Sequence, residues 1–329
     1  MTTFVELLPP HEAVPSNPEW HKLRAEGVSA SEIAAVLGLS PWESPFSLYW
    51  SKVNGWQGDD NNQMRAGRYA ENAIADWYAD VADPHENLVI CRAGLYAHID
   101  RPWQLATPDR LVSEACICQV SNWAPEDSAG CYDCHNSGAA GPPIALLECK
   151  YVIGGWDGWG EPGTDNVPVY YRAQCLWQLD VMGVDEVHLA AWHGADFRIY
   201  IIRRDEKDLR VMRTGAEQFL KRIADEDPPD VDQHTATLRT LKQLHPDLDD
   251  REQEIATTTA EGYRRARALK RHAEDLCNRF EARVRAEMGD ARQAVSDGRK
   301  VASRSIFDVA ESVRQGYTVD RLNPSRSKS

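Results

Sequence analysis

The chain has 329 residues and a formal net charge of −14, from 37 basic and 51 acidic side chains. This length can bury a full hydrophobic core, and the acidic balance argues against a protein that simply coats nucleic acid. The sequence has no apolar stretch long enough for a membrane span, and residues 1–10 lack a basic region followed by an apolar one. We therefore expect a soluble, cytoplasmic protein without a membrane partner.

The amino-terminal part of the chain predicts helices after an irregular lead-in. Residues 1–17 contain Pro9, Pro10 and Pro15, which disfavour regular structure. Ser29 or Ser31 has the side chain of a helix N-cap. The expected helices cover residues 17–24, 31–37, 45–54 and 64–81.

The middle of the chain predicts a sheet with one crossover helix. A helix is expected over residues 169–182, because Gly183 follows an apolar helical pattern. Strands are expected at residues 88–91, 95–99, 105–112, 144–151, 186–192 and 197–203. This order predicts an α/β core in which a mixed central sheet is flanked by helices.

The carboxy-terminal part predicts a mainly helical extension. Helices are expected over residues 206–224 and 249–288, joined by an acidic linker. Ser296-Asp297-Gly298 predicts a hairpin within residues 291–304, and the basic tail from Arg321 is expected to be disordered. We accordingly divide the chain into a core of residues 1–204 and an extension of residues 205–329. The core carries 13 basic and 27 acidic residues, whereas the extension has 24 of each.

The segment Ala145–Lys150 carries the first chemical signal. Side chains alternate along a strand, so Glu148 and Lys150 face one side and Cys149 faces the other. With Asp109 upstream, this is a workable site for Mg²⁺ or Mn²⁺: two carboxylates hold the ion and the lysine lies beside the reacting groups. The alternative is a solvated strand end without chemistry.

A cysteine-bearing insert of about residues 114–142 separates Asp109 from Glu148. Two close pairs of soft ligands in this insert can close a tetrahedral zinc site, which would fold a loop of low apolar content. The alternative is an ordinary loop with reduced thiols. The candidate ligands are Cys116, Cys118, Cys131 and Cys134, with His135 as an alternative to Cys134.

Several blocks, taken together and in this order, resemble the viral recombinase family typified by lambda exonuclease and the YqaJ proteins. This family is a branch of the PD-(D/E)xK nuclease superfamily, whose fold the resemblance implies for residues 20–204. The blocks are Trp20–Arg24, Val28–Ile33, Gly67–Asn72, Thr107–Asp109, Leu147–Lys150 and Tyr171–Gln174.

The resemblance implies a metal site. Asp109 and Glu148 would hold the first ion, with the carbonyl of Cys149 as an additional ligand. Glu71 would complete a second position, so that two ions of Mg²⁺ or Mn²⁺ are expected. The alternative for Glu71 is a solvated flank of an amphipathic helix.

The resemblance also implies roles for polar residues around that site. Lys150 would position or deprotonate the attacking water and stabilise transition-state charge, and Gln174 would orient the water or a phosphate. Arg24 and Ser31 would hold the 5′ phosphate of the strand being degraded. The alternatives are a surface arginine, an N-cap serine, and a plain polar glutamine whose part Gln178 would play.

Two further expectations concern large side chains. Trp20, Trp42, Trp50 and Trp77 are expected in the core more often than as base-stacking groups. Arg110 stands where the family commonly has glycine, which predicts a different turn after Asp109.

The function that the resemblance implies is a Mg²⁺-dependent 5′→3′ exonuclease on ends of double-stranded DNA. It would leave 3′ single strands for an annealing protein in phage-type homologous recombination, as a ring-shaped trimer, in the host cytoplasm if phage-encoded. The alternatives are a PD-(D/E)xK endonuclease, and a nuclease-derived module that only binds DNA or a partner.

Overall fold

The strands expected around Glu148 form a five-stranded sheet in the computed structural model, which describes residues 3–56, 61–82, 88–114, 142–247 and 249–306. Only β7 and β8 pair in parallel, and α6 (Val169–Met182) joins them, while the other neighbours are antiparallel. The sheet order is β3 (Leu88–Arg92), β6 (Arg110–Glu114), β7 (Ala145–Tyr151), β8 (Glu186–His193) and β9 (Asp196–Arg203). The expected α/β class with a mixed sheet is confirmed.

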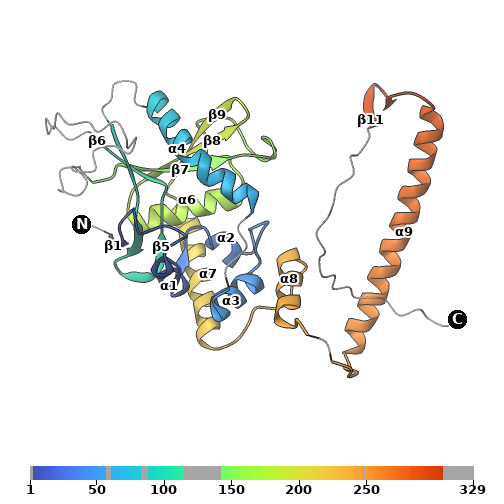
Figure 1. Ribbon diagram of the computed structural model, residues 1–329, viewed down its shortest axis with the longest axis horizontal. Coiled ribbons are helices and arrows are strands. Elements are labelled where there is room, and N and C mark those ends of the chain that lie inside the picture. Colours follow the sequence, from blue (N-terminus) through green and yellow to red (C-terminus); the bar gives the residue numbers. More distant parts are fainter. Residues whose placement is uncertain (1–2, 57–60, 83–87, 115–141, 248, 307–329) are drawn as a thin grey trace. The chain divides into compact units, whose positions relative to one another are not determined.

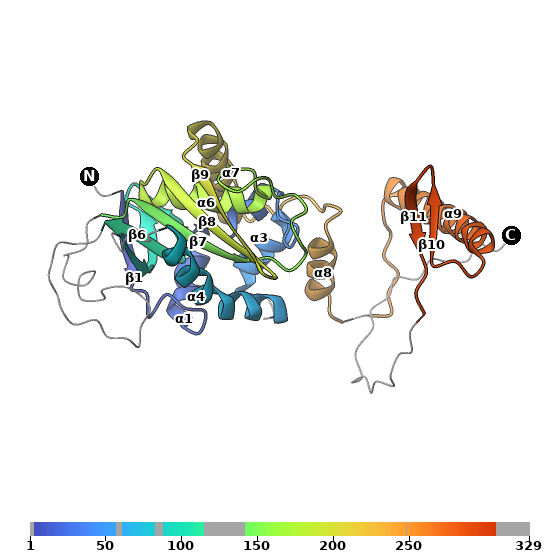
Figure 2. The ribbon, with the colours of Figure 1, turned by 90° about the horizontal axis from the view of Figure 1, so that it is seen from above.

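Strand β7 is buried on both faces, because a helix packs on each side (Figures 1 and 2). Ala145, Leu147 and Cys149 pack in one cluster with α4 (Asn62–Ala82), whereas Leu146 packs in the cluster that contains α6. The alternation places Glu148 on the α6 side, as the strand period predicts.

A second, four-stranded sheet lies beside the first. Its order is β1 (Phe4–Leu8), β4 (Leu95–His98), β5 (Arg101–Ala106) and β2 (Val28–Ser29). Two expectations are therefore wrong: the lead-in contains β1, and the single strand expected over residues 105–112 is split between the two sheets. The split falls at Thr107-Pro108-Asp109, because Pro108 has no N–H and restricts the residue before it.

The chain divides into two compact units, Met1–Leu244 and His245–Ser329. The first unit includes α7 (Glu206–Ala224), whose Leu209, Met212 and Phe219 lie in the main core, and α8 (Thr235–Leu244). The sequence analysis placed both segments in the extension. It did not predict α8, because the buried face of this helix consists of small and polar residues and gives no apolar stripe.

The remaining helices of the first unit are α1 (Pro18–Ala25), α2 (Ile33–Val36) and α3 (Pro45–Asn54). The expected cap of α2 is wrong: Glu32 occupies the N-cap position and its side chain makes no capping hydrogen bond.

The second unit consists of α9 (Thr257–Met288) and the expected hairpin, β10 (Gln293–Ser296) with β11 (Arg299–Ser303). The hairpin turn has positive φ at Asp297 and Gly298, as its sequence predicts. Within the described residues, no helix combines the length and the apolar character that a membrane crossing requires.

A buried aspartate ties the carboxy-terminal end of α6 to its neighbours. The side chain of Asp180 is 1% exposed. It accepts hydrogen bonds from Arg101 Nη2 (3.0 Å), Gln104 Nε2 (2.8 Å), Arg204 Nη2 (2.8 Å) and Arg213 Nε (2.7 Å). Burial alone would raise the pKa of Asp180, but the hydrogen bonds from Arg213 and Gln104 and the arginine charges hold it well below its usual range.

We expect Asp180→Asn to lower the free energy of unfolding by about 3 kcal/mol at pH 7, because three arginines lose their buried counter-charge. Since the folded-state pKa of Asp180 is depressed, its contribution is present above the unfolded pKa and is lost as pH falls through the folded one. Urea denaturation should therefore show a wild-type advantage that narrows below about pH 4. An advantage that is equal at pH 3 and pH 7 would contradict this role of the charge.

Candidate active site

Glu148 is the centre of the candidate site. Its side chain is 3% exposed, and Oε1 accepts hydrogen bonds from Lys150 Nζ and Gln174 Nε2, each at 2.5 Å. Oε2 accepts one from Gln178 Nε2 at 2.7 Å. Lys150 lies on the same strand face two residues on, and the glutamines lie one turn apart on the face of α6 that covers it.

Gln178 is the residue that the sequence analysis named only as a substitute for Gln174. It is fully buried, and its Oε1 is among the few buried side-chain polar atoms in the described residues that lack a hydrogen-bond partner. Both glutamines contact Glu148, so they act together. The i, i+4 spacing was the signal for this pair.

Asp109 lies in the break between β5 and β6, and its Oδ2 accepts the backbone N–H of Cys149 at 2.7 Å. Burial raises the pKa of Asp109 well above its usual range, and the nearby carboxylates of Glu148 and Glu71 raise it further.

Lys150 is the cation of this carboxylate group. Burial would lower the pKa of Lys150, but the charges of Glu148 and Asp109 outweigh burial and raise it. The side chain therefore carries a positive charge at neutral pH, which suits stabilisation of a developing negative charge and disfavours the role of a base.

Glu71 is ion-paired in the structure. Arg110 Nη1 lies 2.5 Å from Glu71 Oε1 and 2.6 Å from the carbonyl oxygen of Asp109. Arg110 Nη2 donates to Asn72 Oδ1 at 2.7 Å. The arginine that departs from the family pattern thus places a buried guanidinium between the expected second metal ligand and Asp109.

The donor set at Asp109 and Glu148 fits one hard cation. These carboxylates are close enough to interact strongly, and together with the carbonyl of Cys149 they offer the oxygen ligands that Mg²⁺ and Mn²⁺ prefer. Among the described residues, no group of three or more His, Cys, Asp or Glu side chains is placed to hold an ion. Glu71 is not drawn into such a group because its carboxylate is bound to Arg110.

The proposed zinc ligands Cys116, Cys118, Cys131 and Cys134, and the alternative His135, lie outside the described residues.

Arg24 and Ser31, expected to bind one phosphate, lie together. Arg24 Nη2 donates to Ser31 Oγ at 2.9 Å and to Ser29 Oγ at 2.8 Å. The Arg24 guanidinium also lies over the ring of Trp20, 4.2 Å from its centroid. Ser29 was named as a cap and missed as part of this cluster, although the Ser-x-Ser spacing places both hydroxyls beside one arginine.

A buried ion pair adjoins this cluster. Lys52 Nζ lies 3.1 Å from Glu32 Oε2 and donates to the carbonyl of Arg24 at 2.9 Å. The Glu32 carboxylate is 4.0 Å from Arg24 Nη2. Burial would raise the pKa of Glu32, but Lys52 and Arg24 lower it overall, so this carboxylate stays ionised beside the arginine.

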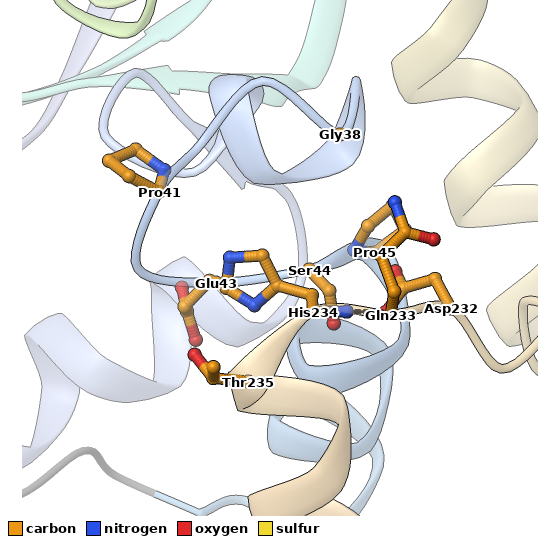
Figure 3. A pocket seen from close by; sticks show the side chains of 9 residues that line it. All are labelled: Gly38, Pro41, Glu43, Ser44, Pro45, Asp232, Gln233, His234 and Thr235. Atoms are coloured by element: carbon orange, nitrogen blue, oxygen red, sulfur yellow. Dashed lines mark hydrogen bonds between the residues drawn. The ribbon is translucent and has the colours of Figure 1, made fainter. Parts of the chain in front are cut away.

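A pocket of about 420 Å³ lies between the loop that precedes α3 and the start of α8 (Figure 3). None of the residues around Glu148 lines it. The lining residues are Gly38, Pro41, Glu43, Ser44, Pro45, Asp232, Gln233, His234 and Thr235.

We expect Arg110→Ala to lower the free energy of unfolding by about 3 kcal/mol, because it removes one partner of a buried ion pair. It also frees Glu71 for a cation, so added Mn²⁺ should raise the Tm of the variant more than that of the wild type. Thermal unfolding with and without Mn²⁺ measures both effects.

Arg92→Ala is the matched control. Arg92 Nη2 also donates to Asn72 Oδ1, at 3.0 Å, but Arg92 is exposed. This control should change stability by less than about 0.5 kcal/mol and keep the wild-type response to Mn²⁺. Equal responses of Arg110→Ala and wild type would show that Glu71 does not become a cation ligand.

Comparison with known proteins gives one family match. A family model described as "YqaJ-like viral recombinase domain" matches residues 19–185. The search of curated proteins returned no match.

Several solved structures are similar in fold. An alkaline exonuclease (LHK-Exo) from Laribacter hongkongensis has 18% identity and a TM-score of 0.44, covering 69% of this chain and 98% of that chain. A phage related exonuclease from Haemophilus somnus 129PT has 10% identity and a TM-score of 0.40, covering 63% and 99%. The KSHV SOX RNA complex has 12% identity and a TM-score of 0.36, covering 68% and 74%.

Proposed function

This chain belongs to the YqaJ-like viral recombinase domain family, a family of nucleases of the lambda-exonuclease type, and we propose that it is a divalent-metal-dependent 5′→3′ exonuclease acting on linear double-stranded DNA. The observation that carries the proposal is the gathering of Lys150, Gln174 and Gln178 on the carboxylate of Glu148, with Asp109 beside it. We assign the five-stranded sheet with α4 and α6 as the PD-(D/E)xK core.

In this mechanism Asp109, Glu148 and the carbonyl of Cys149 would hold Mg²⁺ or Mn²⁺, which would polarise the scissile phosphate and acidify the attacking water. The Lys150 ammonium stabilises the charge that develops on the phosphate oxygens. Gln174 contacts both Lys150 Nζ, at 3.2 Å through Oε1, and Glu148, so it fixes their relative orientation. Gln178 holds the other oxygen of Glu148.

The Arg24 cluster supports end specificity. A guanidinium with the hydroxyls of Ser29 and Ser31 is a donor set for the several oxygens of a terminal phosphate. The stack on Trp20 orients the arginine before a ligand arrives. An endonuclease needs no such site, so the cluster favours the exonuclease over the endonuclease alternative.

The wider role that we propose follows from the family. Degradation from the 5′ end leaves 3′ single strands, which an annealing protein uses in phage-type recombination, and a ring-shaped trimer would retain the DNA. A second ion at Glu71 requires that Glu71 leaves Arg110. Zinc at the four cysteines of the insert stays a prediction, which metal analysis of the purified protein tests.

We expect Lys150→Ala to reduce Mg²⁺-dependent digestion of end-labelled, 5′-phosphorylated linear duplex by about 10³-fold, because the variant loses the cation beside the reacting phosphate. Circular dichroism of the variant controls for folding. Cleavage of closed circular DNA by the wild type would identify an endonuclease. Absence of any digestion by the wild type would leave the module that only binds.

We expect Arg24→Ala to slow digestion of 5′-phosphorylated duplex by about 10- to 100-fold, since charge-assisted hydrogen bonds to the terminal phosphate are lost. The rate on 5′-hydroxyl duplex should hardly change, so the preference for phosphate disappears. Lys22→Ala on the exposed side of α1 is the matched control and should keep the preference. An unchanged preference in Arg24→Ala would contradict the assignment of this cluster.

A further inference from the structure

Trp42 does not lie in the core. Its side chain is 56% exposed, whereas Trp20, Trp50 and Trp77 are partly buried. An exposed tryptophan leaves a large apolar face in water, so its position is the feature to explain.

Trp42 packs against two tyrosines at the start of α6. Its ring meets that of Tyr170 edge to face at 4.7 Å and lies 6.0 Å from the ring of Tyr171. The Lys150 ammonium in turn lies 5.0 Å from the centroid of Tyr171. The exposed indole is therefore connected to the candidate active site through one aromatic ring.

The other side of Trp42 leads to the Arg24 cluster. Glu43, the next residue, lies within electrostatic reach of Glu32, Lys52 and Arg24. Trp42 is thus located between the group proposed to hold the terminal phosphate and the lysine proposed to act at the scissile phosphate.

The loop that carries Trp42 is held on both sides. Ser40 Oγ accepts the backbone N–H groups of Trp42 and Glu43, each at 3.2 Å. Ser44 caps α3, and its hydroxyl lies 2.7 Å from Thr237 Oγ1 of α8. The neighbours of Trp42, Pro41 and Glu43, line the pocket of Figure 3, which does not include Trp42.

We propose that Trp42, backed by Tyr170, is a stacking site for a base of the DNA strand being degraded, within the first nucleotides from the 5′ end. This assignment rests on the proposed function. Bases suit the site because the indole offers a flat apolar face to any base, while the adjoining cations, Arg24 and Lys150, attract the phosphates of the same strand. A base stacked there is separated from its partner strand, which prepares the strand for cleavage.

The test is photo-cross-linking of the full chain to 5′-phosphorylated duplex that carries 5-iodouracil at one of the terminal positions, in EDTA so that the DNA stays intact. Mass spectrometry should locate the cross-link on Trp42. Trp42→Ala should lose it and, with Mg²⁺, raise KM about ten-fold, whereas Trp42→Phe should retain most of both properties. Because the side chain is exposed, the alanine variant should fold.

Phe280→Ala is the matched control, because Phe280 is 55% exposed and lies on α9 of the other unit. It should leave the cross-link unchanged. An equal cross-link in Trp42→Ala, at every labelled position, would overturn the proposal. A cross-link to Trp42 without any Mg²⁺-dependent digestion would keep the stacking site and overturn the exonuclease, so the two failures are distinguishable.

Discussion

The buried carboxylate of Glu148 is the constraint on which the rest of the site depends. A carboxylate that is removed from water is stable only when charged or polar partners replace the water. Here one ammonium and two carboxamides do so. Each donor comes from β7 or α6, so the demands of one acid fix how the helix packs on the strand. The site and the core of the first unit are consequently one structure.

Helix α6 meets these demands along its whole length. Its first turn presents the tyrosines beside Lys150, its middle presents Gln174 and Gln178, and its end holds Asp180 among three arginines. Ion pairs at the end of the helix resist its sliding along the sheet, and sliding would move both glutamines away from Glu148. The Asp180 cluster therefore helps to position the site from a distance.

The sequence was sufficient where local pattern decides the outcome. The two-residue period of β7 placed Glu148 and Lys150 on one face, and glycines marked the ends of α3 and α6. It was insufficient where distant residues decide. Strand β1 depends on pairing with β4, and α8 depends on contacts such as that of Thr237 with Ser44. The exposure of Trp42 has the same cause, since the loop conformation that turns it outward is set by Ser40 and by α8.

The partner of Glu71 also escaped local reasoning, and it changes the charge balance of the site. Three carboxylates, those of Glu71, Asp109 and Glu148, face two cations, Arg110 and Lys150. Arg110 is bound to Glu71 and Lys150 to Glu148, so Asp109 is the acid without a cation of its own. Its raised pKa expresses this deficit. A divalent cation would supply the missing charge at Asp109 first, and Glu71 could contribute only by giving up Arg110. The substitution of arginine for glycine after the motif aspartate thus sets the order in which the carboxylates become available to metal.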